Sequence, residues 1–92
     1  MLKFFKITGH SLYPSYKDGQ RVLCKKITQK SSLYINDTII FEKEPYGLMV
    51  KKITEIIVDK YYVRGSSFDS IDSGDFGYLN KEDIKYKIIL KL

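Results

Sequence analysis

The sequence predicts a small, mostly β domain, with about six to seven strands in a folded sheet or partly closed barrel and at most one short helical turn. β-Branched and aromatic residues recur with alternating polarity, which is typical of strands. No stretch keeps the i, i+3, i+4, i+7 apolar spacing of a helix through three turns. The chain has 92 residues, of which 43% are hydrophobic and 29% charged, which is enough for one core. We therefore expect residues 1–92 to form a single domain.

The expected strands are short and are separated by turn residues. Alternating runs cover residues 3–8, 21–27, 37–42, 47–58, 60–64 and 85–91. Segments rich in Gly, Ser, Pro and Asp separate them, and the longest runs from Gly65 to Gly77. The fourth and fifth runs flank a short turn at Asp59, which predicts a hairpin. A capping residue at Asn80 predicts a helical turn before the last strand.

Composition narrows the classes of function. Sixteen Lys and Arg residues against eleven Asp and Glu give a net charge of +5, but only two of the sixteen are Arg and the lysines are scattered along the chain. Because Arg is the residue that reads phosphate and guanine with paired hydrogen bonds, we expect a solubilising surface and no nucleic-acid partner.

Cysteine and hydropathy indicate the compartment. Cys24 is the single cysteine, so no intramolecular disulfide and no cysteine-based zinc site can form, and we expect neither a metal nor a cofactor. We also expect Cys24 to be a small buried apolar residue of a strand. No apolar run approaches the roughly 18–20 residues that span a bilayer, so the chain encodes no membrane anchor of its own. These observations favour a soluble protein of a reducing, cytoplasmic compartment, and they leave peripheral association with an anionic membrane open.

Three segments carry residues suited to chemistry. The first is Gly9-His10-Ser11-Leu12-Tyr13-Pro14, followed by the turn Gly19-Gln20-Arg21-Val22. The second is Val50-Lys51-Lys52-Ile53, a lysine pair inside an apolar strand, and the third is Ser70-Ile71-Asp72-Ser73-Gly74-Asp75-Phe76-Gly77. A serine hydroxyl becomes a good nucleophile when a base takes its proton, and a lysine can be that base only while neutral. Lowering a lysine pKa from about 10.4 toward 7 costs on the order of 4–5 kcal/mol, which burial in an apolar strand can supply.

Taken in this order, the three segments resemble the Ser/Lys peptidases of the signal-peptidase and LexA-repressor superfamily. The family's first motif, Gly-x-Ser-Met-x-Pro, is matched by Gly9, Ser11, Leu12 and Pro14, and its strand motif is matched by Val50-Lys51-Lys52-Ile53. The end of its third motif is matched by residues 70–77. Because it lacks large insertions, the chain is most similar to small soluble members such as the nickel-superoxide-dismutase maturation proteases. The resemblance implies a serine endopeptidase that cleaves an extended peptide or protein substrate.

The resemblance also assigns roles to single residues. Ser11 would be the nucleophile, and its amide would stabilise the oxyanion beside Gly9, which allows a close backbone approach. Lys51 would be the general base. Ser70 would orient that lysine and Asp72 would hold the loop, while Leu12 and Pro14 would line the substrate groove. His10 is adjacent to Ser11 in an extended segment and would point away from its hydroxyl, so we expect it at the surface.

Strand alternation alone leaves the choice of lysine open. Lys51 shares a face with Met49 and Ile53, whereas Lys52 shares one with Leu48, Val50 and Ile56. Alternation therefore slightly favours Lys52 as the more buried lysine, and the assignment of Lys51 depends on the resemblance.

The third motif differs from the family pattern and keeps an alternative open. Ser66-Ser67 replaces Asp-Asn, the loop is one residue shorter, and Gly74 replaces an Arg. A catalytically weak or inactive β domain that binds peptides by strand addition, or acts as a regulatory module, is the alternative interpretation. Self-cleavage of the LexA type is not expected, because the chain has no alanine and Cys24 is followed by Lys25 rather than Gly.

Overall fold

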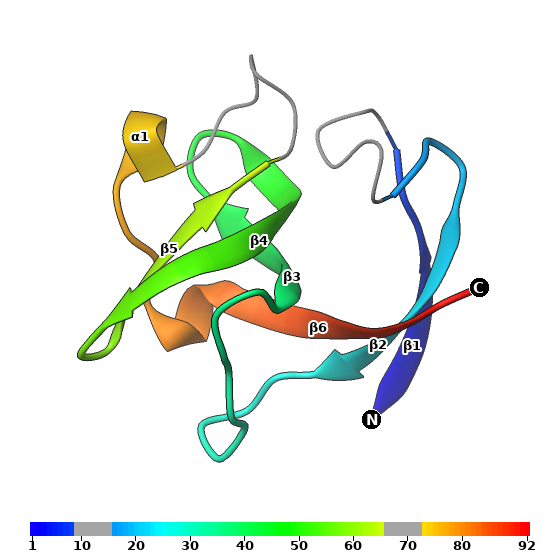
Figure 1. Ribbon diagram of the computed structural model, residues 1–92, viewed down its shortest axis with the longest axis horizontal. Helices are drawn as coiled ribbons and strands as arrows, with labels where there is room; N and C mark the ends of the chain where they lie inside the picture. Colours follow the sequence, from blue (N-terminus) through cyan, green and yellow to red (C-terminus); the bar gives the residue numbers. More distant parts are fainter. Residues whose placement is uncertain (9–15, 66–72) are drawn as a thin grey trace.

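The computed structural model describes residues 1–8, 16–65 and 73–92, and it is mostly β, as predicted. One sheet contains six antiparallel strands (Figure 1). The strands are β1 (Leu2–Lys6), β2 (Arg21–Lys26), β3 (Thr38–Lys43), β4 (Gly47–Ile57), β5 (Lys60–Arg64) and β6 (Ile84–Lys91). A 3-10 turn, η1 (Lys81–Asp83), precedes β6 as expected, and a single helical turn, α1 (Ser73–Phe76), is a further element that the sequence did not suggest.

The strand order is β1-β2-β6-β3-β4-β5, and the sheet is not closed, since β1 and β5 stand at its two edges. Figure 1 shows the sheet folded into two arms, with β1 and β2 in one arm, β4 and β5 in the other, and β6 running between them. Register shifts between Leu23 and Cys24 and between Ile40 and Phe41 mark bulges, which increase local bending and twist. The fold is therefore a bent open sheet whose last strand lies at its centre.

The two faces of the bent sheet build two hydrophobic clusters. The main core gathers side chains of β3, β4 and β5 with those of the loops beneath them, including the fully buried Phe41, Ile53 and Leu79. The second core lies on the other face and contains Ile7, Val22, Cys24 and Ile40. Phe5, Tyr16, Val50, Tyr86 and Ile88 are partly buried residues packed against this second core. β4 therefore contributes to both clusters, with successive residues on opposite faces.

The β4–β5 hairpin confirms the turn predicted at Asp59. Its first turn residue, Val58, has a φ of 55° and is 86% exposed. A β-branched residue is strained in this left-handed region, which Asn and Gly adopt more readily. The hairpin forms in spite of this turn residue, because the paired strands on either side contribute buried side chains to the main core.

Candidate functional site

Lys51 is the only residue of the predicted catalytic set that lies within the described part of the chain. The predicted nucleophile Ser11, its neighbours Gly9, His10, Leu12 and Pro14, and the third-motif residues Ser70 and Asp72 lie outside the described residues. The site is therefore built from Lys51 and from the described residues that border residues 9–15 and 66–72.

Lys51 is a buried lysine on β4, the strand next to the β5 edge of the sheet. All sixteen Lys and Arg residues are described, and Lys51, at 3% exposure, is the one among them that is buried. It pairs with Ile39 of β3 and shares its face with Ile53, and both of these side chains are fully buried in the main core. Lysine is almost never fully buried in proteins. Burial in such surroundings favours the neutral amine, which is the form that can accept a proton.

The structure corrects the expectation that Lys52 is the more buried lysine of the pair. Lys52 is only partly buried and lies opposite Thr38 on β3 and Arg64 on β5. The reason is a register shift between Ile53 and Glu55, where Thr54 is the extra residue. The shift returns Ile56 to the face of the main core, against which it packs, so Ile56 supports the face of Lys51 and not that of Lys52.

The described residues around 9–15 belong to the same cluster as the residue before Lys51. Ile7 is buried in the second core, and Tyr16 and Val50 both pack against that core. The Ile7 amide donates to the Gln20 carbonyl oxygen at 2.8 Å, and the Gly19 amide donates to the Ile7 carbonyl oxygen at 2.7 Å. The described residues on either side of 9–15 are thus held together, and Ile7 and Tyr16 reach the cluster against which Val50 packs, on the face of β4 opposite to Lys51.

The described residues around 66–72 also lie beside β4. Arg64, at the end of β5, pairs with Lys52, and Val63 pairs with Ile53. After the gap, the Ser73 hydroxyl accepts a hydrogen bond of 2.7 Å from the Val63 amide, which fastens the start of α1 to β5. Gly77, with a φ of 85°, ends α1 by donating its amide to the Ser73 carbonyl oxygen. The role of Ser73 was missed in the sequence, where it appeared as one of several serines in a polar loop.

Aromatic rings surround the main-core side of this region. The Phe76 ring of α1 lies 5.9 Å from the Phe41 ring of β3 and 6.0 Å from the Tyr46 ring, measured between centroids.

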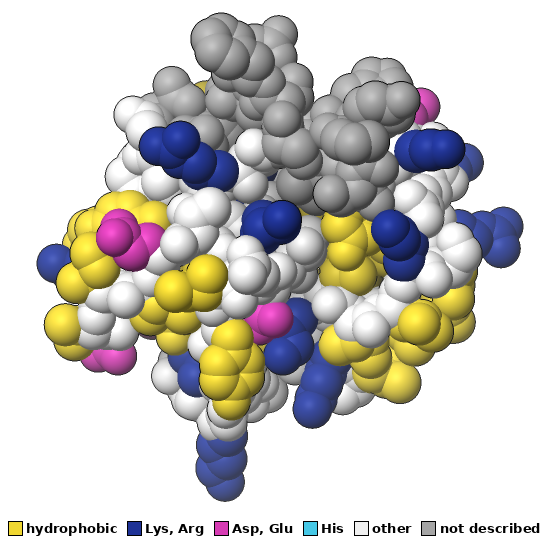
Figure 2. Space-filling view, viewed as in Figure 1, with side chains coloured by type: hydrophobic (Ala, Val, Ile, Leu, Met, Phe, Trp, Pro, Cys, Tyr) yellow, Lys and Arg dark blue, Asp and Glu magenta, His cyan; other side chains and the backbone are white. Residues whose placement is uncertain are grey.

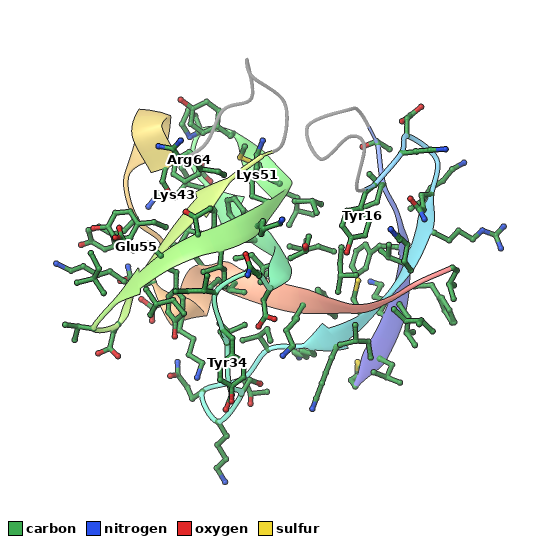
Figure 3. All side chains as sticks on the ribbon, viewed as in Figure 1. Tyr16, Tyr34, Lys43, Lys51, Glu55 and Arg64 are labelled. Atoms are coloured by element: carbon green, nitrogen blue, oxygen red, sulfur yellow. The ribbon has the colours of Figure 1, made fainter. Side chains whose placement is uncertain are left out.

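Figure 3 shows Lys51, Lys43 and Arg64 at the same end of the β3–β4–β5 arm, with Tyr16 across from them on the other arm. Lys43 donates from Nζ to the Tyr78 carbonyl oxygen at 3.3 Å, and Arg64 is exposed. Lys51 is therefore the buried basic residue at this end of the arm, and Lys43 and Arg64 are more solvated.

The remaining chemistry-bearing groups do not form a second centre in the described segments. Cys24 is buried as expected, and burial raises the pKa of its thiol from 9.0 to about 11, so it is a thiol and not a reactive thiolate at neutral pH. Among residues 1–8, 16–65 and 73–92, no three His, Cys, Asp or Glu side chains cluster as metal ligands would. Within the same ranges, no helix has the length and apolarity needed to span a bilayer.

Comparison with known proteins does not assign this chain to a family. No family model matches the chain, and no curated protein sequence matches it.

Proposed function

We propose that this protein is a serine endopeptidase of the Ser/Lys type, with Ser11 as nucleophile and Lys51 as general base. The observation that carries the proposal is the burial of Lys51. The motif resemblance selects this lysine, alternation along β4 does not, and only 3% of its surface is exposed. A buried strand lysine supports base catalysis because desolvation favours the neutral amine.

The proposed reaction has two halves. In the first, the neutral amine of Lys51 takes the proton of the Ser11 hydroxyl as the oxygen attacks the scissile carbonyl. The tetrahedral oxyanion accepts hydrogen bonds from backbone amides, and the ammonium of Lys51 returns the proton to the leaving amine. In the second half, the neutral Lys51 amine takes a proton from water as the water oxygen attacks the acyl carbon, and the Lys51 ammonium then returns that proton to the Ser11 oxygen as the ester bond breaks, which releases the new carboxyl group and the free Ser11 hydroxyl. Atoms and protons balance over the cycle, and no cofactor enters it.

Two described contacts support this arrangement of segments. Ile7 belongs to the second core and both Tyr16 and Val50 pack against it, so this cluster links the borders of the first motif to the strand that carries Lys51. The hydrogen bond from the Val63 amide to Ser73 ties the border of the third motif to the neighbouring strand. The described borders of the first and third motifs thus both reach residues 50–53 of β4, the first on the second-core face and the third through β5, which supports a site shared with Lys51.

The direct test is cleavage of a mixed peptide library, with products identified by mass spectrometry. The proposal predicts that wild-type protein cleaves a subset of peptides, and that Ser11→Ala and Lys51→Met abolish cleavage. Matched controls are Ser15→Ala in the same segment and Lys52→Met on the same strand, both of which should retain activity. An acid-quenched reaction should also show an acyl adduct on the peptide that contains Ser11.

Two outcomes would overturn the proposal. If Lys52→Met abolishes cleavage and Lys51→Met does not, the base has been misassigned. If wild-type protein binds library peptides without cleaving any, the altered third motif has left a peptide-binding β domain, which is the alternative class.

A further inference from the structure

The strand order concentrates positive charge in one half of the sheet. β1, β2 and β6 are neighbours in space although β6 is far from the others in sequence. These three fully described strands carry two, three and three Lys or Arg residues, half of the sixteen in the chain, and none of its eleven Asp and Glu residues. We call this three-stranded unit the cationic sheet.

The register defines one face of the cationic sheet. Cross-strand partners point to the same face of a sheet. Phe4 lies opposite Leu23, which in turn lies opposite Leu90, and Leu2 lies opposite Lys25. The face that carries these residues is turned away from the second core, because the intervening Val22 and Cys24 are the fully buried members of that core. We refer to it as the outer face.

The outer face exposes apolar side chains that a protein in water would normally cover. Phe4 is 64% exposed, and Leu2, Leu90 and Leu92 are each more than half exposed. A hollow of about 400 Å³ beside Phe4 and Leu92 is lined by these two residues and by Phe5, Lys6 and Arg21. Figure 2 shows apolar side chains gathered over this arm of the molecule, with Lys and Arg side chains around them. Contiguous exposed apolar surface with a polar rim marks an interaction site.

Cations surround these apolar side chains on the same face. Lys6 lies opposite Arg21, and Lys25 lies opposite Lys87. The one described ion pair of the region joins Lys87 to Asp37 of the connection before β3, at 3.6 Å, while Lys6, Arg21 and Lys25 are exposed. The outer face therefore offers Phe4 and exposed leucines at its centre and three solvated cations beside them.

We propose that the outer face of the cationic sheet docks on an anionic lipid surface. Aliphatic side chains enter the boundary between headgroups and acyl chains, and lysines beside them are attracted to anionic headgroups within a Debye length. A nucleic acid would match the charge but would leave Leu2, Leu90 and Leu92 without a partner, since single strands bind through aromatic stacking and duplexes mainly through phosphate contacts. One exposed phenylalanine offers little surface for stacking bases, and an apolar centre made mostly of leucines with a cationic rim favours lipid.

The test measures partitioning of the full chain onto sedimented vesicles. We expect binding to phosphatidylcholine vesicles that contain about one third phosphatidylserine, weaker binding to phosphatidylcholine alone, and release by added salt. Replacing Lys6 and Lys25 by Gln should lower the partition coefficient about fivefold per charge. The matched control is Lys30→Gln with Lys60→Gln, two exposed lysines outside the cationic sheet, which should change it much less.

The apolar contribution has its own matched pair. Phe4→Ser with Leu90→Ser should reduce vesicle binding at least tenfold, whereas Leu48→Ser with Ile57→Ser, two exposed apolar residues of β4, should not. All four positions are exposed, so each variant should keep its circular dichroism spectrum. Equal binding to both kinds of vesicle, or loss of binding in the β4 variant as large as in the outer-face variant, would overturn the proposal. So would tighter binding to a single-stranded oligonucleotide than to anionic vesicles, with the Phe4 and Leu90 replacements leaving it unchanged. This inference is independent of the proposed peptidase activity, since none of its variants touches Ser11 or Lys51.

Discussion

Replacement of Lys51 by Ala and by Met separates the packing of its stem from the chemistry of its amine. Both variants remove the amine and every contact it makes, so their difference in stability reports the stem alone. At 3% exposure, the three methylenes beyond Cβ are buried. At about 0.8 kcal/mol per buried methylene, Lys51→Met should be more stable than Lys51→Ala by about 2 kcal/mol, or about 10 °C in midpoint for a domain of this size.

The same pair at Lys52 is the control, measured by urea unfolding followed by circular dichroism. Because Lys52 is only partly buried, its Met and Ala variants should differ by less than about 1 kcal/mol. Peptide cleavage should be lost in both Lys51 variants whatever their stability. Equal stability of Lys51→Met and Lys51→Ala would show that the stem is not packed, and the reasoning from burial to a neutral base would then fail.

Three further predictions test the fold around the site. Burial raises the pKa of Cys24 from 9.0 to about 11, so the stability it contributes is complete below pH 9 and is lost as the pH rises toward 11; the unfolding free energy of wild type should fall relative to Cys24→Ala by about 2 kcal/mol over this window, and parallel pH curves would contradict it. Ser73→Ala removes the acceptor of the Val63 amide, which should cost about 1–2 kcal/mol and speed hydrogen exchange at that amide; unchanged exchange would contradict the contact. Val58→Asn relieves a left-handed β-branched residue and should stabilise the hairpin by about 1 kcal/mol in thermal unfolding, whereas a loss of stability would refute the strain.

The strands could be predicted closely because they are short runs of alternating, β-branched residues between turn residues. The six observed strands begin and end within two residues of the predicted ranges. The extra helical turn α1 could not be predicted, because Ser73–Phe76 is too short to show a helical period. Its start is also held by a hydrogen bond from the Val63 amide, which lies ten positions away in the sequence. Local pattern thus defined elements, and tertiary contacts defined the connections.

The choice between Lys51 and Lys52 shows where alternation fails. Counting apolar neighbours along β4 assumes an unbroken period of two. The shift at Thr54 breaks that period and moves Ile56 to the other face, so the count favoured the wrong lysine. A bulge depends on pairing with the neighbouring strand and leaves little trace in one sequence. The motif resemblance was unaffected, because it uses the position of Lys51 and not the face on which it lies.

The distribution of charge over the sheet also could not be predicted from the sequence. The lysines look scattered when read along the chain, and that pattern indicates a solvated surface. The strand order changes this, because placing β6 between β2 and β3 joins the N-terminal and C-terminal lysine-bearing strands in one unit without acidic residues. The β3–β4–β5 arm keeps Glu42 and Glu55 among its cations and holds the buried Lys51. The position of β6 therefore places the outer face of the cationic sheet and the proposed base on different parts of the sheet. A lipid surface docked on the outer face need not cover the β3–β4–β5 arm that carries Lys51.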